Sequence, residues 1–117
     1  TTNTNVDTTL ATGDPLTLAI AEGARIEILN GTSTGGLAET TSTYLVSQGL
    51  NVTSTGNSDS YSYTTIVYHN AKPYAGDYLA SLMQVPSSRI LNQYDPNGSS
   101  DITVYLGEDW GATNPMQ

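Results

Sequence analysis

The sequence predicts an α+β domain with a ferredoxin-like βαββαβ order, in which an open sheet carries two helices on one face. Three runs alternate polar and apolar residues or concentrate β-branched and aromatic ones, as strands do: 25–29, 64–69 and 102–106. Two other segments, 36–48 and 74–84, place their apolar residues on one helical face. Each of these helices stands between predicted strands, so both are expected to act as crossovers.

The N-terminal part of the chain gives a weaker signal. Residues 1–13 are rich in Thr and Asn with few apolar side chains, which is typical of a linker. In residues 14–22 an Asp-Pro start and a following glycine favour a short helix, whereas the leucines and isoleucine alternate as in a strand. The helix is slightly favoured. We predict a linker or short N-terminal extension over residues 1–23 and one domain over residues 24–117.

The other elements follow from turn residues and breakers. The first predicted strand ends at Asn30-Gly31, the first long helix ends at Gly49, and Pro86 prevents the second long helix from continuing. The remaining expectations are a short strand over 51–55, a polar loop over 56–62, a candidate edge strand over 89–91 and a turn-rich segment over 94–101.

Strand alternation assigns residues to the two faces of the sheet. The helix-facing set is expected to be Ile26, Ile28, Ile66, Tyr68, Ile102, Val104 and Leu106. The opposite face is expected to be bare and to carry Arg25, Glu27, Thr65, Val67, His69, Thr103 and Tyr105. Hydroxyl, aromatic and charged groups together suit a sugar, whose apolar ring face stacks on an aromatic side chain. Coverage of this face by residues 14–22, by another domain or by a second copy stays open.

Tyrosine is the main aromatic residue, with eight copies beside one tryptophan and no phenylalanine. Tyr44, Tyr68 and Tyr78 fall on predicted core positions. The remaining candidates for ligand contacts are Tyr61, Tyr63, Tyr105 and Trp110. A surface with one or two stacking rings predicts weak binding, at about millimolar affinity.

Composition excludes several classes of partner. Three basic residues against eleven acidic ones give a formal net charge of -8. Such a chain lacks the cationic surface that nucleic acids require, and it is repelled by anionic lipids, so neither nucleic-acid binding nor direct membrane binding is expected. There is no cysteine, which removes thiol chemistry. The low charge content and the abundance of hydroxyl side chains indicate an exported protein.

The stretch 26-IEILNGTSTGGLAET-40 has the strand, glycine loop and helix of a phosphate-binding turn. Its glycine spacing fits neither the dinucleotide fingerprint nor the P-loop, and no Lys or Arg stands near the loop. We interpret the glycines as shaping a bend that seats a helix on the sheet. Asn30-Gly31 is expected to supply a positive φ, and Thr32 or Thr34 to cap the helix.

Other candidate sites are also better explained structurally. His69 is the only histidine and has no thiol or second imidazole to share a metal, so it is expected to be a strand-end residue with a satisfied hydrogen bond. The alternating oxygen donors of the turn-rich segment do not fit a calcium loop: Asp95, Asn97, Ser99 and Asp101. Glu108 and Asp109 are adjacent and are read as turn residues before Trp110. No catalytic residue, metal or cofactor is predicted.

Two segments resemble a known family. IEILNGTSTGGLA over residues 26–38 is similar to the opening of the LytR C-terminal domain, an aliphatic strand followed by N-G-T and G-L-A. DITVYLGEDW over residues 101–110 resembles its ending. Between them, Tyr44-Leu45, Gln48-Gly49, the G-N-S-D at 56–59 and Tyr63-Thr64 look like further family positions. The resemblance covers about residues 24–110.

The resemblance implies an accessory domain of LytR-CpsA-Psr proteins of the bacterial cell envelope, carried behind a catalytic domain that transfers lipid-linked glycopolymers to the wall. It therefore implies an extracytoplasmic, non-catalytic module whose partners are peptidoglycan or another wall glycan and the catalytic domain of the parent chain. The alternative is a protein-interaction or dimerisation module of the same parent. The contact surface predicted from the sequence is Arg25, Glu27, Thr65, Val67, His69, Thr103, Tyr105 and Trp110.

Overall fold

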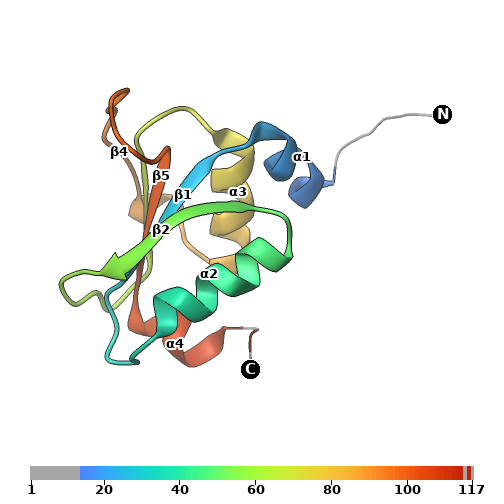
Figure 1. Cartoon of the computed structure of the whole chain (residues 1–117). Coiled ribbons are helices and arrows are strands. Elements are labelled where there is room, and N and C mark those ends of the chain that lie inside the picture. The colour runs from blue at the N-terminus through green and yellow to red at the C-terminus, as the bar shows by residue number, and fades with distance from the viewer. Residues whose placement is uncertain (1–13, 115, 117) are drawn as a thin grey trace.

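The computed structural model describes residues 14–114 and 116, so the linker predicted over residues 1–13 lies outside the described residues. Figure 1 shows a sheet with helices along one side. The elements follow in the order α1 (Pro15–Glu22), β1 (Arg25–Asn30), α2 (Leu37–Ser47), β2 (Asn51–Asn57), β3 (Thr65–Tyr68), α3 (Pro73–Met83), a 3-10 turn (Ser87–Arg89), β4 (Ile90–Asn92), β5 (Ile102–Leu106) and α4 (Glu108–Thr113).

The α+β class and the open sheet are confirmed. The expected βαββαβ order is present as β1-α2-β2-β3-α3-β5, with α1, β4 and α4 in addition. The five strands lie in the order β2-β1-β5-β3-β4. The sheet is mixed: β1 runs parallel to β2 and to β5, β3 runs antiparallel to β5, and β4 runs parallel to β3. The parallel pairs β1/β2 and β3/β4 are each joined by a helix, because a parallel neighbour requires the chain to cross over.

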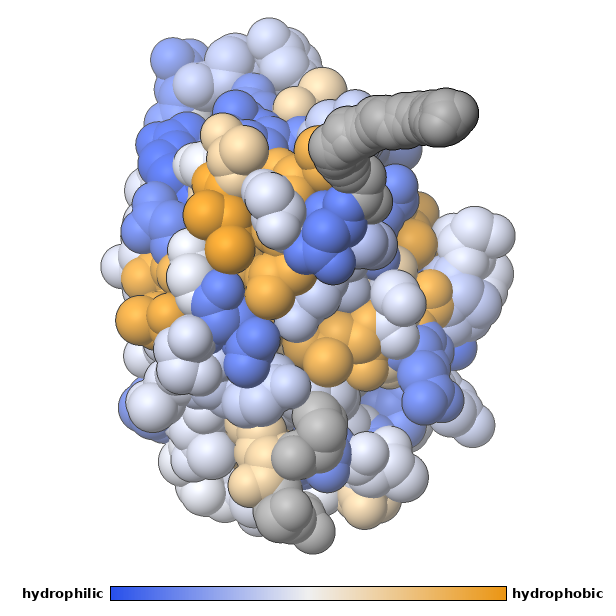
Figure 2. All heavy atoms as spheres, turned by 90° about the vertical axis from the view of Figure 1, so that its right-hand side faces the viewer, coloured by the Kyte–Doolittle hydropathy of each residue, from blue (hydrophilic) through white to orange (hydrophobic). Residues whose placement is uncertain are grey.

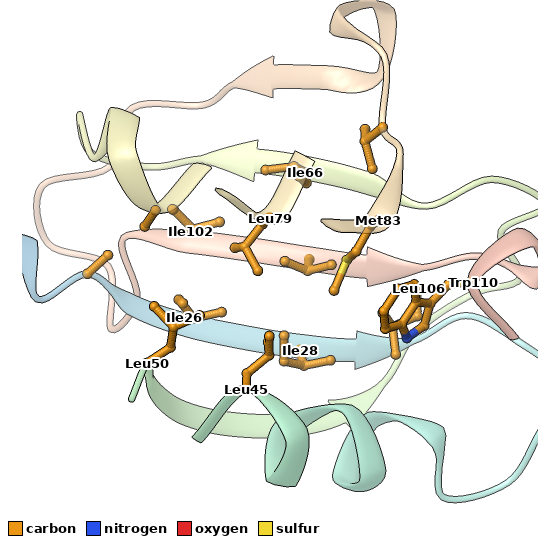
Figure 3. Packing of buried hydrophobic residues seen from close by; sticks show 14 of the residues in the cluster. Ile26, Ile28, Leu45, Leu50, Ile66, Leu79, Met83, Ile102, Leu106 and Trp110 are labelled. Carbon is orange, nitrogen blue, oxygen red and sulfur yellow. The ribbon is translucent and has the colours of Figure 1, made fainter. Parts of the chain in front are cut away.

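The core lies between the sheet and its helices. Six of the seven residues expected to face the helices are fully buried, and Tyr68 is partly buried against them. Figure 3 shows Leu45 of α2 beside Ile28 and Leu79 of α3 beside Ile102, and all four belong to one core cluster. Each such side chain contributes about 1.5–3 kcal/mol on burial. This layer fixes the sheet, and therefore the strand ends where ligands can bind.

The ambiguous segment 14–22 is a helix. Asp14 caps it, its Oδ2 accepting a hydrogen bond from the Thr17 amide at 3.0 Å, and Gly23 ends it in the left-handed region at φ 68°. Ala19 is buried, and α1 packs along α3. The Glu22 carboxylate accepts hydrogen bonds from the amides of Tyr74 and Ala75 at 3.2 and 2.9 Å. The carboxylate of α1 therefore occupies the amino end of α3, where a negative charge is favoured.

Two elements differ from the sequence prediction by more than one residue at an end. Strand β2 runs on to Asn57, into the expected polar loop, because every residue of it except Thr53 pairs with β1. Glu108 and Asp109, read as turn residues, instead open the short helix α4. Asp109 Oδ1 accepts hydrogen bonds from the amide and hydroxyl of Thr64 at 2.9 and 2.8 Å. A side chain that joins α4 to the start of β3 is a tertiary contact, which no local turn pattern shows.

The helical side of the molecule carries mixed polarity. In Figure 2, which turns this side to the viewer, apolar residues gather in patches separated by hydrophilic ones. Ile20 of α1 and Val46 of α2 are among the exposed apolar side chains. None of the helices within residues 14–114 has both the length and the apolar character that a membrane span needs.

Candidate functional site

The glycine loop between β1 and α2 is occupied by contacts within the chain. Asn30 organises it: its Oδ1 accepts hydrogen bonds from the Thr32 amide and hydroxyl at 2.9 and 2.6 Å, and its Nδ2 donates to the Thr34 carbonyl at 2.8 Å. The Ser33 amide donates to Glu108 Oε2 at 2.9 Å. A carboxylate of the chain therefore lies where a phosphate-binding turn would hold its anion.

Two details of this loop correct the sequence prediction. Helix α2 is preceded by Gly36 at φ 78° and has no side-chain cap; the Thr32 hydroxyl is bonded instead to Asn30 and to the Thr34 amide. Gly31 does not have a positive φ. It is needed for close approach: a Cβ at this position would lie 2.8 Å from the Leu106 carbonyl and 2.9 Å from that of Asp59. The positive φ before α2 is thus at Gly36, whereas Gly31 packs against the end of β5 and the segment after β2 and not against the helix.

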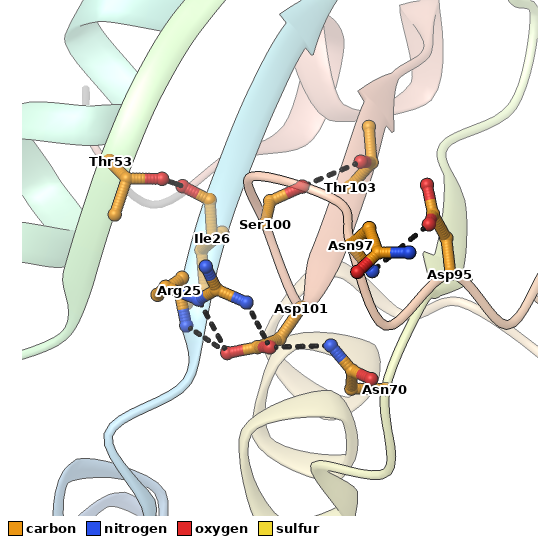
Figure 4. Close-up of polar contacts among 9 residues, drawn as sticks. All are labelled: Arg25, Ile26, Thr53, Asn70, Asp95, Asn97, Ser100, Asp101 and Thr103. Atoms are coloured by element: carbon orange, nitrogen blue, oxygen red, sulfur yellow. Dashed lines mark hydrogen bonds and ion pairs between the residues drawn. The ribbon is translucent and has the colours of Figure 1, made fainter.

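On the sheet face away from the helices, Arg25 pairs with Asp101 (Figure 4). Arg25 Nη2 lies 3.0 Å from Asp101 Oδ1, the Arg25 amide donates to Oδ2 at 2.8 Å, and Asn70 Nδ2 donates to Oδ1 at 2.9 Å. The Arg25 hydrogen bonds hold the pKa of Asp101 well below its ordinary value, against the opposing effect of burial. The same pair raises the pKa of Arg25. Asp101 is therefore committed to a structural ion pair.

The centre of the same face is not bare, which corrects our expectation. Val67 is only 3% exposed and Thr103 only 2%. Thr103 Oγ1 donates to Glu27 Oε1 at 3.1 Å and lies 2.9 Å from His69 Nε2. His69 Nδ1 lies 3.0 Å from the Gln93 carbonyl oxygen. The buried Thr103 and the half-buried Glu27 and His69, joined by hydrogen bonds, thus stand where we expected an open surface for a sugar.

A histidine beside a hydroxyl also raises the question of nucleophilic catalysis. In a Ser-His-Asp site the base is oriented by a carboxylate and the hydroxyl is open to substrate. Here the second nitrogen of His69 meets a backbone carbonyl, and the Thr103 hydroxyl is buried and bonded to Glu27. The arrangement is that of a strand-end histidine that ties β3 to the segment after β4.

The four aromatic residues predicted to contact a ligand, Tyr61, Tyr63, Tyr105 and Trp110, differ in their exposure. Tyr105 stacks on Tyr61 with ring centroids 5.0 Å apart, and burial is the main cause that raises its pKa. Trp110 is wrong as a contact residue: it is 2% exposed, and its Nε1 donates to Thr41 Oγ1 at 3.0 Å inside the core. Only Tyr63 is largely exposed, with the Arg89 guanidinium 4.9 Å from its ring centroid.

A hollow of about 430 Å³ lies beside the start of α3, at the carboxyl ends of β3 and β4. We call it the β3–β4 groove. Its lining residues are Tyr68, His69, Asn70, Ala71, Lys72, Pro73, Asn92 and Tyr94. Of the sequence-predicted contact residues, only His69 belongs to it. Tyr94 is 77% exposed, whereas Tyr68 is partly buried, and burial followed by the charges of Asp77 and Glu22 raises its pKa.

Sequence reasoning missed this groove because its two halves are about twenty residues apart. They meet because β4 pairs in parallel with β3, which places Asn92 beside Tyr68. Ligands of such sheets commonly bind beyond the carboxyl ends of parallel strands. The polar and aromatic Asn92-Gln93-Tyr94 run directly after the edge strand was the one available signal.

The described residues offer no metal centre, since no three His, Asp or Glu side chains among them are placed to share an ion.

Comparison with known proteins gives one finding. Residues 23–110 match a family model described as LytR cell envelope-related transcriptional attenuator, which covers most of the chain. No curated protein and no solved structure matches the chain.

Proposed function

Because the chain belongs to the LytR C-terminal family, a family of cell-envelope, LytR-CpsA-Psr-associated domains, we propose that it is an extracytoplasmic binding module that holds wall glycan. In this proposal it works beside the catalytic domain of a parent protein and carries out no chemistry itself. The family is one of regulatory or accessory domains and is not known for catalysis. Peptidoglycan is the proposed ligand.

The observation that carries the proposal is the β3–β4 groove. It combines an exposed aromatic ring, Tyr94, with the Asn92 amide and the Lys72 ammonium around one hollow. Sugar-binding sites need an apolar plane for the ring face and a few fixed polar groups for hydroxyl and acetamido groups. The groove supplies an exposed aromatic ring and polar groups beside it, whereas the sheet face predicted from the sequence has buried its central residues.

The charge of the chain limits the ligands that fit. A net charge of -8 disfavours nucleic acids and other polyanions, and neutral or weakly charged saccharides are not repelled. The hollow is small and largely open beside one exposed ring, so we expect a Kd of about 1 mM, or about -4 kcal/mol. An accessory domain that acts next to a surface of repeated ligands can work at this affinity, because linkage to the parent protein raises the effective concentration of the domain at that surface.

The test is titration of soluble muropeptides into isotope-labelled protein, with co-sedimentation on purified peptidoglycan as a second readout. Shifts should concentrate on the groove residues, and Tyr94→Ala should abolish them. Tyr63→Ala is the matched control, because Tyr63 is also exposed but faces Arg89 outside the groove. Tyr105→Ala tests the sheet face and should leave binding unchanged. No shift and no sedimentation above background at millimolar ligand would remove the proposal.

A second candidate function, dimerisation, is favoured by one observation. Strand β2 is an outer strand of the sheet, seven residues long, and none of its residues is buried. Such an edge presents backbone groups that a further strand can pair with. Light scattering over a hundredfold concentration range checks this: a mass that rises with concentration supports it, and a constant monomer mass counts against it.

A further inference from the structure

The three basic side chains of the chain differ in whether they form an ion pair. Arg25 pairs with Asp101 at 3.0 Å, and Arg89 lies 3.6 Å from Asp109 while its Nε donates to the Thr64 carbonyl. Lys72 has no carboxylate within 4.0 Å among the described residues, although eleven acidic side chains are available to so few cations. It is also half-buried and is one of the residues that line the β3–β4 groove.

The other polar groups of the groove divide into committed and free ones. Both nitrogens of His69 are bonded, and Asn70 Nδ2 is held by Asp101. No hydrogen bond within the described part of the chain uses the side chain of Asn92 or the hydroxyl of Tyr94. The groups without a partner among the described residues therefore include the Lys72 ammonium, the Asn92 amide and the Tyr94 phenol.

Acidic groups near the groove limit how much negative charge it accepts. Glu22 lies at the first turn of α3, where the Tyr74 and Ala75 amides hold its carboxylate. Asp95 follows Tyr94 directly, and its Oδ1 accepts only the Asn97 amide. A ligand with one carboxylate gains the contact with Lys72. A chain of phosphates would meet these acids and the net charge of -8 as well.

We propose that the β3–β4 groove binds a saccharide that carries a single carboxylate, with Lys72 as the residue that selects the charge. This rests on the proposed glycan-binding function and names the ligand class within it. The sugar ring packs on Tyr94, the Asn92 amide meets an acetamido or hydroxyl group, and the Lys72 ammonium pairs with the carboxylate. Wall fragments whose peptide ends in a free carboxylate belong to this class, and their amidated forms do not.

The test uses two muropeptides that are identical except for one peptide carboxylate, which is free in one and a carboxamide in the other. The free acid should bind about two- to fivefold more tightly to the wild-type protein at low salt, because an exposed ion pair contributes a modest energy. The preference should shrink at high salt. It should vanish in Lys72→Gln and persist in Lys72→Arg, with unchanged spectra elsewhere in both variants.

Each outcome is decisive. Equal binding of the two muropeptides to the wild type overturns the role of the carboxylate, and a preference that survives in Lys72→Gln overturns the role of Lys72. Either result leaves glycan binding in place. Failure of both muropeptides to bind removes the proposed function and this inference with it. Tighter binding of a soluble glycerol-phosphate polymer than of the free acid shows that the groove selects polyphosphate, and overturns the assignment to a single carboxylate.

Discussion

Replacement of Trp110 tests whether this residue belongs to the core, as the structure shows, or to the contact surface predicted from the sequence. The indole lies in the core, 2% exposed, and its N–H donates to the hydroxyl of Thr41, which is itself fully buried. Trp110→Ala removes the largest side chain of this part of the core and leaves a cavity. We expect it to cost about 3–5 kcal/mol of unfolding free energy. That is a large share of the about 5–15 kcal/mol typical of a domain.

The hydrogen bond can be measured separately by a double-mutant cycle. Trp110→Phe leaves the Thr41 hydroxyl buried without its donor, and Thr41→Val leaves the indole N–H without its acceptor. Each single change should cost about 1–3 kcal/mol. The double variant should cost less than the sum, because both polar groups are then gone. Urea unfolding followed by circular dichroism is suitable, because the chain has only one tryptophan and fluorescence would lose its probe in two variants.

Two results would refute this reasoning. An unfolding free energy that does not change in Trp110→Ala would show that the indole is not part of the core. Strict additivity of Trp110→Phe and Thr41→Val would show that the two side chains do not interact. If Trp110→Ala instead lost glycan binding at unchanged stability, the surface role predicted from the sequence would be restored.

Two further predictions concern the ion pair and the close packing of α3. The pKa of Asp101 is lowered in the folded state, so its contribution to stability is complete above the unfolded-state pKa of about 4 and is lost as pH falls below it. In urea unfolding, Asp101→Asn should therefore lose less stability than the wild type between about pH 7 and about pH 3. An identical pH dependence of the two proteins would contradict this. A methyl group at Gly76 would overlap the ring and hydroxyl of Tyr68, so Gly76→Ala should lower the unfolding free energy by about 1–3 kcal/mol in thermal unfolding. Gly35→Ala, where nothing lies within 4 Å, is the control and should change it much less.

The element pattern of this domain was readable from the sequence because its signals are local. Alternation in the strands identified six buried residues of the helix-facing layer, since a period of two fixes which side chains share a face. The opening and ending motifs identified the family that the comparison then showed. Asp14, Pro15 and Gly23 marked the ends of α1, because caps and breakers act within one helical turn.

The candidate site was not readable in the same way. Alternation assigned Val67 and Thr103 to the outer face correctly, but it does not report what covers a face, and His69 and Glu27 fill the space around Thr103. Trp110 was predicted to be a contact residue because it is aromatic, whereas helix α4 directs its side chain into the core. The predicted surface and the groove share only His69, because the groove depends on which strand lies next to β3.

The sequence by itself determined the class of the domain, its family, the helix-facing core and the net charge of -8. These depend on residues close together in the chain or on composition alone. Only the tertiary structure decided that β4 lies parallel beside β3, that Glu108 fills the glycine loop, and that Lys72 and Tyr94 share one hollow. Those facts depend on segments distant in the chain, whose contacts are selected by the packing of the whole sheet.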